Sequence, residues 1–128
     1  MAEESKARAT GIGGFFFRSR DPEALKAWYA EHLGVAWGDG APWAQKAGYT
    51  VFEPFKMDDD YFESDRTYMM NFRIDDLARL IDQLKATGIE VIEKEEWNSE
   101  IGRFARIHDP EGNPIELWEP GAPPPDSC

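Results

Sequence analysis

The chain has 128 residues, of which 41% are hydrophobic, and its formal net charge is −11. A chain of this length forms one compact domain or two small interdependent units, which excludes two independent cores. The negative charge repels phosphate backbones and anionic lipid, so nucleic acid and membrane surfaces are not expected partners. A single cysteine, Cys128, and an N-terminal stretch from Met1 to Thr10 without a long apolar run predict a cytoplasmic protein.

Two segments combine helical periodicity with start and stop signals. The first begins at Asp21-Pro22 and ends before Gly34, with apolar residues at steps of three and four between them. The second begins at Asp75-Asp76 and ends before Gly88 with the same spacing. Each predicted helix therefore buries one apolar stripe.

Short runs around these helices are rich in aromatic and β-branched residues and are bounded by turn residues, which is typical of strands. The predicted strands are residues 13–18, 43–47, 49–55, 68–74, 90–97, 103–108 and 114–119. The order of elements is strand, helix and several strands, and then the same order again.

The two halves also agree in residue identity. Four residues recur 55 positions later in the same order, namely Phe17, Arg18, Asp21 and Leu25 as Phe72, Arg73, Asp76 and Leu80. Order and spacing favour a duplicated unit. The alternative is chance, because any two strand-helix units can share an aromatic residue and a capping aspartate.

Two segments resemble a known superfamily. Residues 11–22, GIGGFFFRSRDP, with Trp28-Tyr29 and Leu33-Gly34 behind them, resemble the opening strand and helix of the vicinal oxygen chelate superfamily, which includes glyoxalase I, bleomycin-resistance proteins and extradiol dioxygenases. Residues 109–120, DPEGNPIELWEP, are similar to its closing turn and strand. The resemblance implies an α+β, glyoxalase-like fold, in which two βαβββ modules with one helix each form a cupped, mixed and strongly curved sheet.

With this resemblance, the chain divides into five parts. We expect a disordered N-terminus at 1–10, a first module at 11–56, an acidic linker at 57–66, a second module at 67–120 and a proline-rich tail at 121–128. The negative charge of the linker is expected to lie outside the cavity. Modules of this kind pair to close the cup, so a homodimer is also expected.

Strand alternation assigns side chains to the core or to the cavity. In the last strand, Ile115 and Leu117 are assigned to the core, and Glu116 and Trp118 to the cavity. The same argument gives the full set of candidate ligand-binding residues: Phe16, Arg18, Thr50, Phe52, Asn71, Arg73, Phe104, Glu116 and Trp118. Aromatic residues with a few polar anchors suit a small amphipathic molecule.

The two arginines of this set have two interpretations. Arg18 and Arg73 either form a salt bridge with Glu116 or a nearby aspartate, or they anchor an anionic ligand. A guanidinium that has a buried carboxylate for a partner is usually structural.

The resemblance implies metal ligands at one position in the first strand and one in the last strand of each module. These positions hold Gly14, Thr50, Met69 and Glu116, and only Glu116 can ligate; a second alignment places Glu53 at the position of Thr50. A divalent transition metal normally needs three or four ligands from His, Cys, Asp or Glu. We therefore predict no cofactor, and a divalent metal is the less favoured alternative.

Three functions stay open from the sequence. The favoured one is a metal-independent, small-molecule binding protein of the bleomycin-resistance kind without a confident catalytic residue. The second is a divalent-metal lyase, isomerase or dioxygenase of glyoxalase type with Glu116 as ligand or base. The third is a module without a ligand, whose cavity would be plugged by Phe16, Met69 and Trp118.

Overall fold

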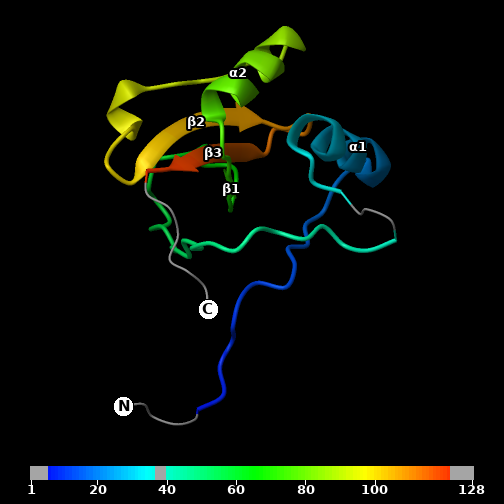
Figure 1. Ribbon diagram of the computed structural model, residues 1–128, viewed down its shortest axis with the longest axis vertical. Helices are drawn as coiled ribbons and strands as arrows, with labels where there is room; N and C mark the ends of the chain where they lie inside the picture. The colour runs from blue at the N-terminus through cyan, green and yellow to red at the C-terminus, as the bar shows by residue number, and fades with distance from the viewer. Residues whose placement is uncertain (1–5, 37–39, 122–128) are drawn as a thin grey trace.

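The protein folds into two helices and a three-stranded sheet (Figure 1). The computed structural model describes residues 6–36 and 40–121, so most of the predicted tail and the first half of the predicted disordered N-terminus lie outside the described residues. The elements in chain order are α1 (Pro22–Leu33), β1 (Met70–Arg73), α2 (Leu77–Ala86), the 3₁₀ turn η1 (Glu95–Trp97), β2 (Gly102–His108) and β3 (Pro114–Pro120).

Both predicted helices are confirmed, and both begin in the same way. Asp21 and Asp76 are the N-caps, with φ/ψ of −142°/82° and −144°/81°. The side chain of each aspartate accepts a hydrogen bond of 3.2 Å from the backbone N–H three residues later, which satisfies one of the free donors of the first turn. These two caps are one of the residue pairs that are 55 positions apart, so the structure repeats the start of the helix as well as its sequence.

The sheet has the order β1-β3-β2. The central strand β3 pairs in parallel with β1 and antiparallel with β2. Asn71 and Arg106 are both in register with Glu116, and in the next row Arg73 and Phe104 are in register with Trp118. Side chains of one row lie next to each other on one face of the sheet.

The core lies between the other face of this sheet and the helices. Its fully buried sheet residues are Ala105 and Ile107 of β2 and Ile115 and Leu117 of β3. The helices add Leu25 and Tyr29 of α1 and Leu77, Ile81 and Leu84 of α2. In Figure 1, α2 lies above the sheet, and the chain that leads from α1 to β1 passes below it. The predicted core faces of β2 and β3 are therefore confirmed.

The predicted turn between β2 and β3 is a network centred on Asp109, which is 4% exposed. One carboxylate oxygen of Asp109 accepts from the backbone N–H groups of Glu111 and Asn113, and the other accepts from the side-chain amide of Asn113 and the hydroxyl of Tyr29. Gly112 has a φ of 84°, which glycine adopts without strain. The turn thus connects α1 to the end of the sheet.

Several predicted strands do not form. Among the described residues before β1, α1 is the one regular element, so residues 13–18, 43–47 and 49–55 are not strands here. The predicted strand 90–97 is reduced to a single bridge between Ile92 and Arg106, followed by η1. Strand propensity produces a strand only where a partner completes the ladder of hydrogen bonds. In the described chain residues 13–18, 43–47 and 49–55 have no such partner, and residues 90–97 have one only at Ile92. The predicted α+β class is confirmed, but the expected two-module pattern is only partly visible.

The described helices are too short and too polar for any of them to cross a membrane.

Candidate functional site

The sheet face opposite the helices carries polar and aromatic side chains. Alternation along β3 points Glu116 and Trp118 to this face, because Ile115 and Leu117 are in the core. The register then brings Asn71 to one side of Glu116 and Arg106 to the other. We call this set Asn71, Glu116 and Arg106 the polar row.

Glu116 is the centre of the polar row, and the residue is 9% exposed. Asn71 donates a side-chain N–H to one oxygen at 2.8 Å. The hydroxyl of Tyr61 donates to the other oxygen at 2.5 Å. Because both oxygens accept a hydrogen bond, the burial of this carboxylate is compensated.

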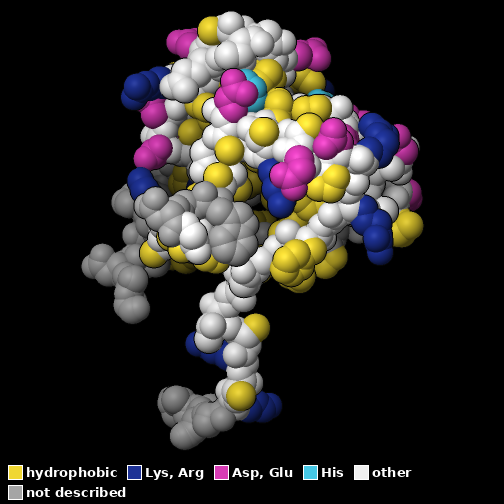
Figure 2. Space-filling model, turned by 90° about the vertical axis from the view of Figure 1, so that its right-hand side faces the viewer, with side chains coloured by type: hydrophobic (Ala, Val, Ile, Leu, Met, Phe, Trp, Pro, Cys, Tyr) yellow, Lys and Arg dark blue, Asp and Glu magenta, His cyan; other side chains and the backbone are white. Residues whose placement is uncertain are grey.

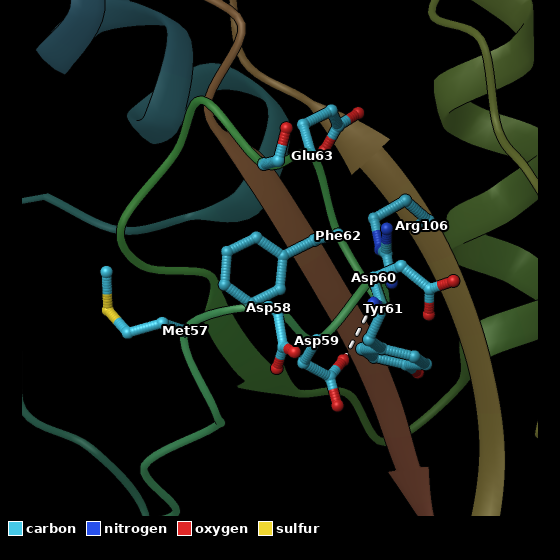
Figure 3. Close-up of a pocket in the computed structure, with 9 residues that line it drawn as sticks. Met57, Asp58, Asp59, Asp60, Tyr61, Phe62, Glu63 and Arg106 are labelled. Atoms are coloured by element: carbon cyan, nitrogen blue, oxygen red, sulfur yellow. Dashed lines mark hydrogen bonds between the residues drawn. The ribbon is translucent and has the colours of Figure 1, made fainter.

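Tyr61 comes from the acidic linker, residues 57–66, which lies against this face of the sheet (Figure 3). Two further residues of the linker, Glu63 and Arg66, attach it to the rest of the protein. Glu63 is 2.7 Å from Nε2 of His108 on β2, and Arg66 donates to the carbonyl of Glu111 at 3.0 Å and to the side chain of Asn113 at 3.2 Å. The linker is thus held at the sheet and at the turn.

The position of the linker corrects one expectation. Its negative charge does not lie away from the site, because its residues border an open hollow of about 440 Å³ together with Arg106. The hollow is lined by Met57, Asp58, Asp59, Asp60, Tyr61, Phe62, Glu63, Ser64 and Arg106.

Arg106 is 5% exposed, and its guanidinium lies next to two aromatic rings that also contact each other. Its guanidinium carbon is 4.9 Å from the ring centre of Tyr61 and 5.1 Å from that of Trp97. One guanidinium nitrogen donates to the carbonyl of Tyr61 at 3.3 Å, and the buried Nε has no hydrogen-bond partner. No carboxylate of the described residues lies within salt-bridge distance of Arg106, so the two rings provide its main stabilisation.

These surroundings shift the pKa values of two linker residues, Tyr61 and Glu63. Burial, and then the hydrogen bond to Glu116, raise the pKa of Tyr61 to about 12. Burial also tends to raise the pKa of Glu63, but a backbone hydrogen bond and the contact with His108 outweigh it and lower that pKa overall. Tyr61 is therefore a neutral hydrogen-bond donor at neutral pH.

Five of the predicted ligand-binding residues lie together on this face. Asn71 and Glu116 are bonded to each other, and Arg73 follows in the next row. The rings of Phe104 and Trp118 are stacked, 6.2 Å apart and 5° from parallel. The strand alternation of the second half therefore placed these five side chains on one face, as the structure does.

The other four predicted residues, Phe16, Arg18, Thr50 and Phe52, are exposed. Phe16 is 93% exposed and Phe52 is 82% exposed, so Phe16 does not plug a cavity. The expected salt bridge between Arg73 and Glu116 does not form: Glu116 binds Asn71 and Tyr61, and Arg73 donates to the carbonyl of Lys46 at 2.9 Å. The segments of the first half are not strands, so the rule that successive strand side chains alternate between two faces does not apply to them.

The sequence missed Tyr61, Trp97 and Arg106 as members of the site. Alternation did place Arg106 on the correct face of β2, but Tyr61 and Trp97 lie outside the strands and follow no periodicity. The available signal was the presence of aromatic residues in acidic segments, which is too general to indicate a contact.

The residues of the site do not fit a divalent metal. Both oxygens of Glu116 are occupied by hydrogen bonds from Tyr61 and Asn71. Gly14 has no ligand atom, and Thr50 and Met69 are poor ligands for such an ion. Residues 6–36 and 40–121 contain no group of three or more His, Cys, Asp or Glu side chains that could hold one.

Comparison with known proteins agrees with this fold. The glyoxalase-like domain family matches residues 14–118, which is most of the chain. One similar solved structure is TnmS3, described as an antibiotic binding protein from Streptomyces sp. CB03234. Its TM-score is 0.61 at 23% identity, over 90% of this chain and 99% of that chain. No curated protein sequence matches. The extent of the family match and the shared fold show that this chain belongs to the glyoxalase-like domain family of the vicinal oxygen chelate superfamily.

Proposed function

We propose that this protein binds an organic small molecule on the helix-free face of the sheet, without a metal. The observation that carries the proposal is the buried polar row, in which Glu116 and Arg106 lie side by side under the linker. Buried polar groups surrounded by aromatic rings are typical of sites that orient a mostly apolar ligand.

The aromatic side chains beside the polar row would supply the apolar contacts. Phe104 and Trp118 present a stacked pair of partly buried rings, and Trp97 lies beside the guanidinium of Arg106. The description of TnmS3 as an antibiotic binding protein supports an antibiotic-like organic molecule as the ligand. The poor donor set around Glu116 supports binding without a cofactor.

The test is a titration of bleomycin and a panel of planar aromatic antibiotics, followed by tryptophan fluorescence in buffer with EDTA. We expect a ligand that binds with one-to-one stoichiometry and with the same affinity in a second titration, without EDTA and with added zinc or manganese. Phe104→Leu should weaken binding about three- to tenfold, since stacking of aromatic rings contributes on the order of 1 kcal/mol.

Trp43→Phe is the matched control, because Trp43 packs against Phe72 and not against the polar row. Its affinity should equal that of the wild type. Absence of any binder from the panel, or binding that requires a metal, would contradict the proposal.

We also propose that the protein is a cytoplasmic homodimer. One cysteine in 128 residues suits a reducing compartment. For the dimer, the support is that β1 pairs only with β3 in the described sheet and so leaves one edge free. The unpaired segments of the first half carry exposed apolar residues that a second copy would cover.

A further inference from the structure

Tyr61 occupies the polar row as a bound ligand would. Its hydroxyl donates to Glu116, and its ring lies over the guanidinium of Arg106. The ring of Trp97 packs edge-on against it, with 6.0 Å between ring centres. The phenol group of Tyr61 therefore contacts a hydrogen-bond acceptor, a guanidinium group and an aromatic ring.

The environment selects the neutral form of a phenol. Glu116 is an acceptor, and Asp58, Asp59, Asp60 and Glu63 border the adjoining hollow, so a phenolate or a carboxylate would be repelled. Arg106 does not reverse this preference, because its charge lowers the pKa of Tyr61 less than burial and Glu116 raise it. The raised pKa of Tyr61 is consistent with this selection.

The attachment of Tyr61 permits its displacement. The linker is fixed after Tyr61 by the contacts of Glu63 and Arg66, whereas the preceding residues 57–60 are exposed. Within the linker, Tyr61 is positioned by one hydrogen bond of 2.8 Å, from its N–H to Asp59. The open hollow beside it, about 440 Å³, gives an incoming molecule access to the same place (Figure 3).

We propose that the polar row is a subsite for a neutral phenol, and that Tyr61 is its internal occupant, which a ligand with a hydroxylated aromatic ring displaces. This inference rests on the proposed small-molecule binding and names the ligand group that donates a hydrogen bond to Glu116. Displacement exchanges one phenolic hydroxyl for another, so Glu116 keeps both of its hydrogen bonds, and Arg106 keeps an aromatic ring over its face.

The probe for the test is 4-nitrophenol, whose neutral and ionised forms have separate absorption bands. The titration is made at the pH at which half of the free compound is ionised. We expect the wild-type protein to bind 4-nitrophenol in the neutral form, so that the phenolate band decreases as protein is added. Hydrogen exchange of residues 57–66 should become faster in the complex, because Tyr61 has left the polar row.

Two variants test the competition. Tyr61→Phe keeps the ring but cannot donate to Glu116, so the internal occupant is weaker and 4-nitrophenol should bind at least about threefold tighter. Glu116→Gln offers a neutral acceptor and should weaken binding at least about threefold and reduce the preference for the neutral form. Tyr68→Phe is the control, because Tyr68 packs against Phe15 and Phe17, and it should leave binding unchanged.

The outcomes separate this inference from the proposed function. Binding of the phenolate form, or no effect of Tyr61→Phe on the affinity, overturns the inference. If an aromatic antibiotic binds with the expected sensitivity to Phe104→Leu while 4-nitrophenol fails these tests, the proposed function stands and Tyr61 is a fixed part of the site. The expected result with 4-nitrophenol, without binding of any antibiotic, supports the subsite and contradicts the antibiotic as its ligand.

Discussion

Asp109 shows how one buried residue can connect distant parts of this chain. It receives hydrogen bonds from its own turn and, at 2.8 Å, from the hydroxyl of Tyr29 on α1. Burial and the bond to Asp109 raise the pKa of Tyr29 well above its usual value of 10.0, so the hydroxyl remains a donor. The position of α1 relative to the sheet thus depends on a contact between residues 80 positions apart.

The first prediction concerns this contact. Tyr29→Phe leaves a buried oxygen of Asp109 with one donor fewer, and it should lower the free energy of unfolding by about 1–3 kcal/mol. Urea denaturation measures the change. Tyr49→Phe is the matched control, since Tyr49 is exposed and its hydroxyl has no hydrogen bond among the described residues. If both variants are equally stable, the hydroxyl of Tyr29 does not contribute to stability and only its ring does.

The second prediction concerns the ionisation of Tyr61. Its pKa is raised from 10.0 to about 12, so the unfolded chain loses this proton at lower pH than the folded protein. The contribution of Tyr61 to stability is then fully present below pH 10 and is lost as the pH rises toward 12. Denaturation at a series of alkaline pH values should show a smaller decrease for Tyr61→Phe than for the wild type. If Tyr61→Phe loses as much stability as the wild type at alkaline pH, the hydroxyl of Tyr61 is exposed to solvent.

The linker is the element whose role differs most from its sequence. Its acidic composition and lack of periodicity predict a solvated connection. In the structure the linker covers the polar row. The hydroxyl of Tyr61 donates a hydrogen bond to Glu116, and the contact between Glu63 and His108 attaches the following residues to β2. A connection between two halves therefore also forms one wall of the candidate site.

The third prediction tests the attachment of the linker. His108→Gln removes the imidazole that contacts Glu63, so amide hydrogen exchange of residues 57–66 should become faster while that of α2 is unchanged. The lowered pKa of Glu63 means that its contribution is present above pH 4.5 and is lost as the pH falls through its lowered value. In His32→Gln, the control, exchange in the linker should not change, because His32 contacts Trp28 and Glu31 of α1. Unchanged exchange in His108→Gln would show that Tyr61 and Arg66 hold the linker without this pair.

The molecule as a whole buries its core on one side of the sheet and leaves apolar surface elsewhere. Figure 2 shows hydrophobic side chains on the outside of the body and an extended N-terminal segment that projects from it. Phe16, Phe52 and Val51 are among the most exposed of these residues. Exposed apolar surface next to a free sheet edge favours association.

The fourth prediction follows from this surface. Sedimentation at micromolar concentration should give the mass of a dimer for the wild type, and Phe16→Ser with Phe52→Ser should shift the equilibrium toward the monomer about tenfold or more, since each buried aromatic ring contributes on the order of 1.5–3 kcal/mol. Lys26→Ser with Lys56→Ser is a control of equal size on exposed polar positions. A monomeric wild type would contradict the proposed homodimer.

The sequence alone predicted the features that depend on neighbouring residues. The starts of both helices follow from a capping aspartate and the residues behind it, and the turn at 109–113 follows from Asp109, Gly112 and Asn113. Alternation along β2 and β3 placed Phe104, Glu116 and Trp118 on one face, because the side-chain period of a strand is local. With Asn71 and Arg73 of β1, five of the nine candidate residues lie on this face.

The remaining features depend on which segments meet in space. Residues 13–18 and 43–55 have the composition of strands, but composition provides no partner for their backbone groups, and in the structure they stay unpaired. Likewise, the identity of Tyr61 does not indicate that its hydroxyl reaches Glu116, 55 residues later in the chain. Local chemistry thus determined the caps, the turn and the faces of the strands, whereas the occupant of the polar row was decided by long-range packing of the linker on the sheet.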